Sequence, residues 1–370
     1  MASERIRKLL AFMEDNGIEL FVALHGGVHS FLEPNPVYLL SGAKAIGESM
    51  VLLWRGGGEL VVTPGWDAER IARRTDLKVT AANHLLPVLQ KKLAGARLVP
   101  ERIGFAGLGE FGREFHGAVA AMLGHPPREL DRELYRVAGS VKSPEEIERA
   151  RKAAWIAERA YERMLECARP GMTEYELAAE VDRQVKKLGA DANFQLMSAS
   201  QHNRAIRVPG PRVLEKGDVV LAEISPSYEG QFAQICRTVV LGEVGEAFLE
   251  KYELQVRAMR KGMEAAVPGA RMSDVFRAVN RLLEEHGYGE YCRPPWIRVR
   301  GHGLGVGSVL PGNVSEDNDT VLEKGMVFVL HPNQYFPETG YLMCGEPVVI
   351  GDGGAEPLTR RKPAVDFIPC

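Results

Sequence analysis

The stretch Gly217–Thr238 is GDVVLAEISPSYEGQFAQICRT, and this pattern predicts two strands joined by a tight turn. The first strand begins with β-branched residues directly after the turn Lys216-Gly217-Asp218. Tyr228-Glu229-Gly230 forms the connection to the second strand. Glu223 lies on the first arm and Gln234 on the second. Strands that face further strands hold polar side chains rigidly, so this hairpin is predicted to carry part of a functional site.

Length and composition indicate a soluble globular chain with a full hydrophobic core. The chain has 370 residues, of which 45% are hydrophobic and 26% charged, and its formal net charge is -3. This charge gives no electrostatic basis for binding nucleic acid or an anionic membrane. No apolar run reaches the roughly 20 residues that a membrane span needs. A nucleic-acid or membrane partner is therefore not predicted.

The cysteine pattern predicts a reducing environment. The five cysteines are Cys167, Cys236, Cys292, Cys344 and Cys370. Their number is odd and they form no CxxC pair, which argues against a disulfide framework or a zinc finger. The first residues lack the apolar segment of a signal peptide, so a cytoplasmic location is expected.

The first part of the chain, residues 1–138, is predicted to be a small α/β domain. A helix is expected over residues 4–16, because Ile6, Leu9 and Met13 recur with helical period. Further elements are expected as strands at 18–24, 49–54, 59–63 and 102–106, and as helices at 67–74 and 112–123. Strands that alternate with helices are typical of the α/β class.

The pattern changes over the next residues, and 139–370 are predicted to be an α+β domain. Ser143 and Glu146 form a capping box that begins a long helix, which ends at about Ala168. Thr173 and Glu176 form a second capping box. A third helix is expected over 273–286, and strands are expected over much of the remainder.

Several motifs in this second part occur in the order of a known family. They are Lys142-Ser143-Pro144-Glu145-Glu146, Arg169-Pro170-Gly171-Met172-Thr173-Glu174, Lys216-Gly217-Asp218-Val219-Val220, Arg237-Thr238, Gly301-His302-Gly303-Leu304-Gly305 and Lys324-Gly325-Met326-Val327-Phe328. The chain resembles the creatinase, aminopeptidase P and prolidase family over nearly its whole length. The resemblance implies a creatinase-type α/β domain (1–138), a pita-bread α+β domain with a curved antiparallel sheet (139–370), and a homodimer.

The metallopeptidases of this family hold two metal ions with Asp, Asp, His, Glu and Glu. The resemblance places these five positions on Glu223, Gln234, His302, His331, and either Gly345 or Glu346. Only His302 is a clear match. Gln234 is neutral and cannot supply the carboxylate that bridges two divalent cations. The two-metal peptidase mechanism is therefore not expected.

Two further histidines of the family are replaced here by Val309 and Ile206. Creatinase is the family's precedent for catalysis without metal, with a histidine and carboxylates in place of the ions. Its essential histidine also falls at the position of Ile206. The resemblance therefore supports chemistry without metal, but it does not supply the base.

Three residues are predicted to be catalytic: Glu223, His302 and His331. A buried carboxylate without a cationic partner has a raised pKa, which suits proton transfer. The alternative for Glu223 is a structural ion pair with an arginine or lysine. The histidines are either proton-transfer groups or hydrogen-bonded residues of the core.

Five residues are predicted to bind substrate: Gln234, His202, Arg204, Arg207 and Glu346. The amide of Gln234 can bond a polar substrate or bridge strands. The arginines of the loop before the hairpin can grip a carboxylate, and the alternative is a solvated loop. Cys236 and Cys344 on neighbouring strands are interpreted mainly as small buried hydrophobic residues.

Three functions remain open. The first, which we favour, is a metal-independent, creatinase-like hydrolase of a C–N bond in a small polar molecule, without a cofactor. The second is an Xaa-Pro peptidase-like enzyme with a rebuilt mononuclear metal site of Glu223, His302 and His331, with Glu346 or Cys344 as a fourth ligand. The third is a non-catalytic binding protein, although a disused buried site tends to lose its polar residues.

Overall fold

The computed structural model describes residues 4–27, 30–95, 98–308 and 311–370. The chain divides into two compact units, Met1–Ser140 and Val141–Cys370. Among the described residues, every helix is too short or too polar to cross a bilayer.

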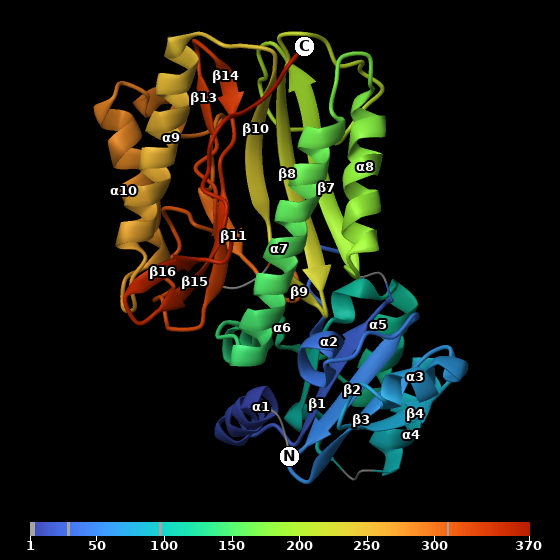
Figure 1. Cartoon of the computed structure of the whole chain (residues 1–370). Coiled ribbons are helices and arrows are strands. Elements are labelled where there is room, and N and C mark those ends of the chain that lie inside the picture. The colour runs from blue at the N-terminus through green and yellow to red at the C-terminus, as the bar shows by residue number, and fades with distance from the viewer. Residues whose placement is uncertain (1–3, 28–29, 96–97, 309–310) are drawn as a thin grey trace. The chain divides into compact units, whose positions relative to one another are not determined.

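The first unit is built on a mixed six-stranded sheet in the order β4-β3-β2-β1-β5-β6 (Figure 1). The strands are β1 (Leu20–His25), β2 (Ser49–Trp54), β3 (Gly57–Val62), β4 (Lys78–Ala81), β5 (Ile103–Ala106) and β6 (Arg128–Glu129). The helices are α1 (Glu4–Asp15), α2 (Pro36–Ser41), α3 (Ala68–Ala72), α4 (Leu85–Gly95), α5 (Arg113–Leu123) and α6 (Asp131–Leu134). The predicted α/β alternation is confirmed, while α2, β4, α4, β6 and α6 are additions to the expected elements.

The second unit contains two main sheets. One has the order β17-β10-β8-β7 with β9 paired to β8, and the other has the order β11-β12-β15-β16. The strands of the first sheet are β7 (Ala192–Ser200), β8 (Val219–Tyr228), β9 (Gln231–Phe232), β10 (Ile235–Leu241) and β17 (Asp366–Ile368). Those of the second are β11 (Gly301–Gly303), β12 (Val327–Leu330), β15 (Glu346–Gly351) and β16 (Gly354–Pro357), and β13 (Gln334–Phe336) pairs with β14 (Gly340–Leu342). All these pairs are antiparallel except β10 with β17.

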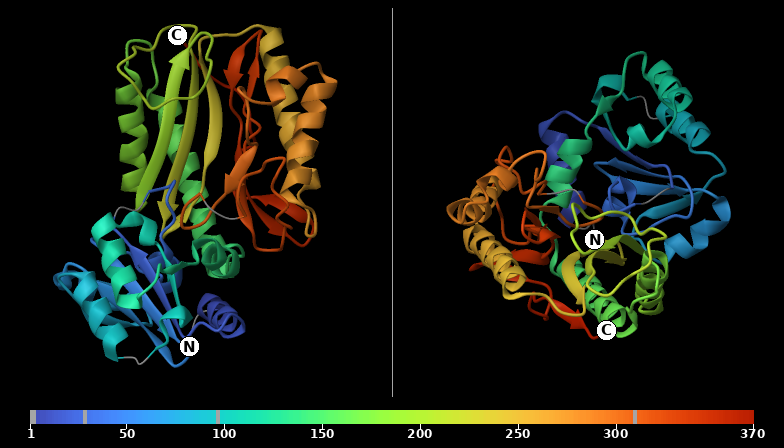
Figure 2. Two further views of the ribbon diagram at one scale, coloured as in Figure 1. Left: turned by 180° about the vertical axis from the view of Figure 1, so that it is seen from behind. Right: turned by 90° about the horizontal axis from the view of Figure 1, so that it is seen from above.

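Two helix pairs pack against these sheets (Figures 1 and 2). They are α7 (Pro144–Cys167) with α8 (Glu174–Lys187), and α9 (Glu246–Ala265) with α10 (Met272–Glu285). The capping box of Ser143 is confirmed: its hydroxyl accepts from the Glu146 backbone N–H at 3.3 Å, and Glu146 accepts from the Ser143 N–H at 2.9 Å. Helix α9 was not expected from the sequence. Its N-cap is Gly245, which has no side chain to cap the helix and therefore leaves no start signal.

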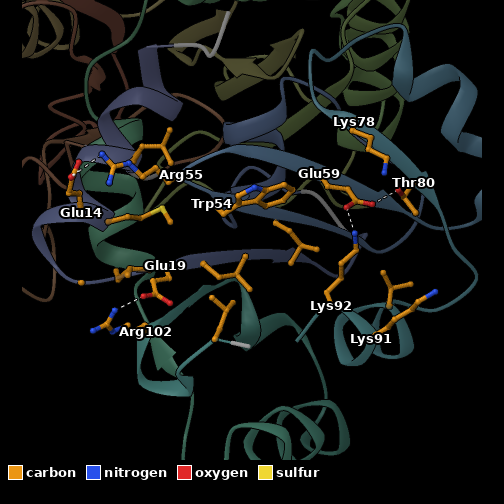
Figure 3. A pocket seen from close by; sticks show the side chains of 18 of the residues that line it. Glu14, Glu19, Trp54, Arg55, Glu59, Lys78, Thr80, Lys91, Lys92 and Arg102 are labelled. Atoms are coloured by element: carbon orange, nitrogen blue, oxygen red, sulfur yellow. Dashed lines mark hydrogen bonds and ion pairs between the residues drawn. The ribbon is translucent and has the colours of Figure 1, made fainter. Parts of the chain in front are cut away.

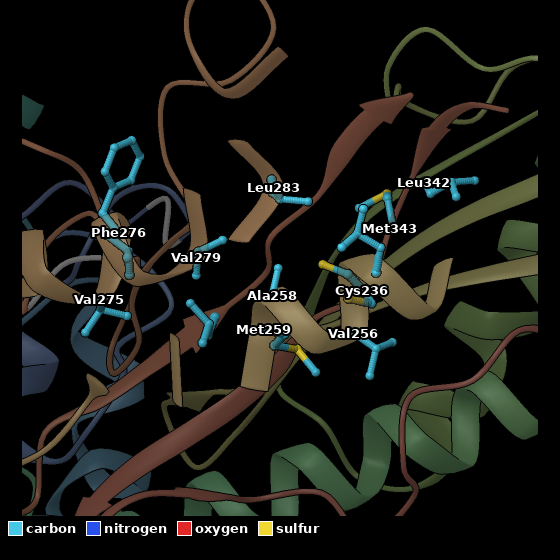
Figure 4. Packing of buried hydrophobic residues seen from close by; sticks show 14 of the residues in the cluster. Cys236, Val256, Ala258, Met259, Val275, Phe276, Val279, Leu283, Leu342 and Met343 are labelled. Carbon is cyan, nitrogen blue, oxygen red and sulfur yellow. The ribbon is translucent and has the colours of Figure 1, made fainter. Parts of the chain in front are cut away.

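The two faces of β8 contact different helix pairs. Val220, Ala222 and Ile224 belong to the core cluster that includes residues of α7 and α8. Val219 and Leu221 belong to the cluster that includes α9 and α10 (Figure 4). Because side chains alternate along a strand, Glu223 points to the same side as Val219 and Leu221, away from α7 and α8.

The predicted hairpin is confirmed with a shorter turn. Glu229 and Gly230 have φ angles of 43° and 78°, and a two-residue type I′ turn requires positive φ at both positions. Tyr228 pairs with Gln231 at the turn, and the same register places Glu223 opposite Cys236 further along. The tight turn therefore fixes which residues meet across the hairpin.

Candidate active site

A row of four positions crosses the two sheets of the second unit. Glu223 on β8 pairs with Cys236 on β10. Cys236 exchanges two backbone hydrogen bonds with Gly345, at 3.2 and 3.1 Å. The register of β12 with β15 brings His331 opposite Gly345, and a Cβ built on Gly345 would lie 2.6 Å from the His331 Cβ. Directly opposed residues share a face, so Glu223, Cys236, Gly345 and His331 lie along one face.

His302 on β11 extends this row. The ring centroids of His302 and His331 are 5.3 Å apart, with the planes at 63°. The Nδ1 atom of His302 lies 2.9 Å from the Ser308 hydroxyl. The structure thus gathers the three predicted catalytic residues in one row, although they come from three separate stretches of the chain.

Glu223 is held in this row without a cation. It is 8% exposed, and no cation of the described residues forms an ion pair with it. Its hydrogen-bond contact is the Cys236 thiol, whose Sγ is 3.9 Å from Oε2 and is a weak donor. Burial raises the pKa of Glu223 to about 7, and the thiol contact opposes this rise. The carboxyl therefore exchanges protons near neutral pH.

The two histidines are neutral at that pH. Burial lowers the pKa of His302 to about 4. Burial, and after it the nearby His302, lower the pKa of His331 to about 3. A neutral imidazole carries one N–H donor and one acceptor nitrogen, so each ring can both give and receive a hydrogen bond.

Two buried amide oxygens beside the row have no donor among the described residues. Gln234 is fully buried, and its Nε2 lies 3.6 Å from the Cys236 sulfur while its Oε1 accepts no hydrogen bond. Asn333 has its Nδ2 3.4 Å from Nδ1 of His331, and its Oδ1 accepts no hydrogen bond either. A buried acceptor without a donor is costly, and such groups mark a place where a ligand or water donates.

Glu346, which is predicted to bind substrate, lies on the face of its strand opposite to the row. Its Oε1 is 2.7 Å from a guanidinium nitrogen of Arg237, and both side chains are at most 2% exposed. The Thr359 hydroxyl donates to its other oxygen. These contacts are those of a structural ion pair, and substrate binding by Glu346 stays a prediction. Of the two candidates for the fifth position of the family's ligand set, Gly345 shares the face of the row and has no side chain.

The three loop residues predicted to bind substrate, His202, Arg204 and Arg207, lie exposed outside the row. His202 is exposed, and its Nε2 lies 3.2 Å from the Tyr335 hydroxyl. Arg204 and Arg207 are exposed, and the described residues offer their side chains no hydrogen bond or ion pair. Tyr335 in turn stacks on Trp296 with ring centroids 4.4 Å apart. Substrate binding by these three loop residues stays a prediction.

Sequence patterns assigned no site role to three residues that lie in the row or beside it, Cys236, Asn333 and Tyr341. Cys236 could have been found from the hairpin register, because a two-residue turn after Tyr228 places it opposite Glu223. Asn333 and Tyr341 follow from pairings distant in sequence and left no local signal. Burial raises the pKa of the Tyr341 phenol, and the nearby Cys236 and Glu223 groups raise it further, so the phenol stays protonated.

The side chains present do not fit the family's two-metal centre. Of its five ligand positions, one holds a neutral amide and one a glycine. Within the described part of the chain, no three His, Cys, Asp or Glu side chains converge as metal ligands, so the mononuclear site of Glu223, His302 and His331 is not assembled either. Ile206 packs against the hydrophobic cluster of α9 and α10 and supplies no base. Val309 lies outside the described residues.

Comparison with known proteins places the chain in a family. Residues 148–355 match the model of metallopeptidase family M24. The chain is 28% identical over 367 residues to a Xaa-Pro dipeptidase of Pyrococcus furiosus, a match that covers 97% of this chain and 98% of that protein. A Xaa-Pro dipeptidase of Pyrococcus horikoshii is 26% identical over 366 residues, with the same coverage. The chain belongs to metallopeptidase family M24, whose peptidases are hydrolases of C–N bonds.

Solved structures support the fold. A prolidase from Pyrococcus horikoshii superposes with a TM-score of 0.85 at 24% identity, covering 98% of this chain and 100% of that chain. An X-Pro aminopeptidase from Thermotoga maritima gives a TM-score of 0.82 at 22% identity, covering 98% and 99%. The predicted fold class, a creatinase-type α/β domain followed by a pita-bread domain, is confirmed.

Proposed function

We propose that this chain is a peptidase-type hydrolase that cleaves a C–N bond in a small substrate rich in N–H groups, without the metal pair of its family. The observation that supports this proposal is a buried set of acceptors that lack donors. Among the described residues, the carboxyl group of Glu223 has no cation, and the amide oxygens of Gln234 and Asn333 have no hydrogen-bond donor. An ammonium or guanidinium group of a dipeptide-sized molecule offers the donors that these acceptors need.

The mechanism uses the protonation states of the row. With a pKa of about 7, Glu223 is partly ionised at neutral pH. The ionised form takes a proton from a water molecule, whose oxygen adds to the carbonyl or amidine carbon. The protonated form then gives the proton to the leaving nitrogen, and the C–N bond breaks. The neutral rings of His302 and His331 donate N–H hydrogen bonds to polar groups of the reacting centre.

Activity measurements on a defined panel test this proposal. The panel contains free dipeptides with and without proline, small amides and guanidino compounds, and products are quantified by mass spectrometry. Each reaction is run with a chelator and, separately, with added Mn²⁺, Co²⁺ or Zn²⁺. We expect turnover that survives the chelator and a kcat/KM that changes through pH 7.

Matched variants identify the groups that act. Glu223→Gln keeps the shape and removes proton transfer, and it should lower kcat by about 10²- to 10⁴-fold. Gln234→Leu should raise KM more than it lowers kcat, because it removes an acceptor for the substrate. Glu264→Gln on the exposed face of α9 is the control and should change neither. Activity that appears only with added metal would contradict the proposal, and absence of hydrolysis across the panel would favour a binding protein.

A homodimer and a cytoplasmic location complete the proposal. All five cysteines are free thiols, which supports a reducing compartment. The homodimer is supported by the family resemblance, and light scattering coupled to gel filtration tests it directly.

A further inference from the structure

The first unit contains a large groove that shares no residue with the row of the second unit. The cavity has a volume of about 1500 Å³. It is lined by the C-terminal part of α1 with the residues that follow it, by the ends of β2, β3 and β4 near the β2–β3 turn, and by α4 (Figure 3).

The centre of this groove is apolar. Leu10 of α1, Leu52 and Trp54 of β2, and Val88 of α4 contribute to its lining. Trp54 is 38% exposed, although a tryptophan buries more apolar surface than almost any other side chain. An open apolar surface bordered by charged residues marks a binding surface more often than an accident of folding.

The edge of the groove has an excess of positive charge. Its cations are Arg7, Arg55, Lys78, Lys91, Lys92 and Arg102, and its carboxylates are Glu14, Glu19 and Glu59. Each carboxylate is already paired with a different cation, Glu14 with Arg55, Glu19 with Arg102 and Glu59 with Lys92. Among the lining residues that the structure describes, six cations less three carboxylates leave a net charge of +3.

Three of the cations have no ion pair of their own. Arg7, Lys78 and Lys91 are exposed, and no hydrogen bond or ion pair joins their side chains to another residue of the described chain. The charge of Lys78 lowers the pKa of Glu59 at longer range, without an ion pair between the two side chains. A ligand that carries carboxylates would find these three charges available.

The charges lie at two ends with the apolar centre between them. Figure 3 shows Arg55 and Arg102 on one side of Trp54, and Lys78 and Lys91 on the other. An amphiphile with one anionic head satisfies only one of these ends. The ion pairs of Arg55 with Glu14 and of Arg102 with Glu19 are exposed and therefore weak, so these arginines can also pair with a ligand. A peptide with acidic residues on both sides of an apolar middle therefore satisfies both ends.

The volume also suits a peptide. Small-molecule sites measure about 300–1000 Å³, so this groove is larger than most of them. A helix about 10–12 Å wide that rises 1.5 Å per residue fills roughly 120–170 Å³ per residue. The groove therefore accommodates about ten residues, or nearly three turns.

We propose that this groove binds a segment of a protein partner, about ten residues long, with an apolar centre and acidic residues at both ends. The site is independent of the hydrolase reaction proposed above. Its recognition combines burial of Trp54 with pairing of Arg7, Lys78 and Lys91 to carboxylates.

The test uses synthetic peptides and the full-length chain. The acidic probe has leucine and phenylalanine in its centre and two glutamates at each end, and in the matched probe lysines replace the glutamates. Binding is measured by fluorescence anisotropy at two salt concentrations. We expect the acidic probe to bind at least tenfold more tightly than the lysine probe, with an affinity that falls at high salt.

Charge-reversal variants locate the binding. Lys78→Glu combined with Lys91→Glu should weaken the acidic probe at least tenfold. The control combines Lys187→Glu with Lys362→Glu, two exposed lysines of the second unit, and should leave the affinity unchanged. Circular dichroism verifies that each variant is folded. Equal binding of both probes, equal loss in both double variants, or binding of dodecanoate in place of the acidic peptide would overturn the proposal.

Discussion

Replacing Glu223 with glutamine is expected to stabilise the protein in alkaline solution and to change its stability little near pH 5. The reason is the burial of a carboxyl group that has no cationic partner. In the unfolded chain this group ionises with its ordinary pKa of about 4.5, whereas in the folded chain its pKa is about 7. Glutamine has nearly the same shape and does not ionise.

The magnitude follows from the two pKa values. Each pKa unit corresponds to about 1.4 kcal/mol. A rise from 4.5 to about 7 therefore lowers the free energy of unfolding by about 3 kcal/mol once Glu223 is ionised in both the folded and the unfolded chain. The pKa of Glu223 is higher in the folded state than in the unfolded state. The contribution of this carboxyl group to stability is therefore complete below pH 4.5 and is lost as the pH rises to 7. At pH 5 the wild-type protein has lost less than about 1 kcal/mol, and at pH 8.5 it has lost the full amount.

Scanning calorimetry at pH 5 and pH 8.5 measures this difference. For a unit of this size, 3 kcal/mol corresponds to a rise in Tm of about 6–12 °C for the transition of Val141–Cys370. The contrast variant is Glu346→Gln, which leaves the buried charge of Arg237 without its carboxylate. It should destabilise the same unit by about 3–5 kcal/mol at both pH values.

The opposite result would refute the reasoning. If Glu223→Gln lowers Tm at pH 8.5, the carboxylate has a favourable partner and is a structural ion. If the variant raises Tm equally at both pH values, the gain has a cause other than ionisation. Either result would also remove the basis for assigning proton transfer to Glu223.

Four further changes have defined outcomes. Between pH 6.5 and about 4 the protein should lose stability. The pKa values of His302 and His331 are lowered in the folded state, so the unfolded chain takes up these protons first as the pH falls. His331→Gln should reduce this loss in the same calorimetric scans. Gly345→Ala should cost about 1–3 kcal/mol, because the new methyl group would lie 2.6 Å from the His331 Cβ, and an unchanged Tm would argue against the packed row. Ser143→Ala should cost about 1 kcal/mol through loss of the cap of α7, measured by thermal melting in circular dichroism. Leu330→Ala should cost about 2–5 kcal/mol, since Leu330 is fully buried, and urea titration would show it as a lower midpoint.

Features set by a few neighbouring residues were predictable from the sequence. The capping boxes at Ser143 and Thr173 act within one helical turn, and the Glu229-Gly230 turn needs positive φ at two adjacent positions. Such signals depend only on local chemistry. Helix α9 follows the N-cap Gly245, which has no capping side chain, so the helix has no local start signal and is stabilised by packing against α10.

The candidate site was predictable in its residue types and only partly in its geometry. Glu223, His302 and His331 share a row because strands pair in register, and the family motifs identified these positions. The register around Gly345 could not be obtained locally, because the Cys236–Gly345 and Arg237–Glu346 contacts join distant parts of the chain. A shift of one residue reverses the face of a strand. This is why the sequence alone left open whether Gly345 or Glu346 shares the face of the row.

The bridge between Cys236 and Gly345 also constrains when the row can form during folding. More than a hundred residues separate these two positions, so closing the bridge carries a large loop-closure entropy, whereas the β7–β8–β10 sheet with α7 and α8 depends on nearer contacts. On a chain still emerging from the ribosome β12 and β15 are not yet made, so we expect Glu223 to lie in a hairpin that these strands do not yet cover. Its carboxyl group is then hydrated and acidic in the ordinary way. The proton affinity that suits Glu223 to its chemistry is acquired only when the last third of the chain arrives.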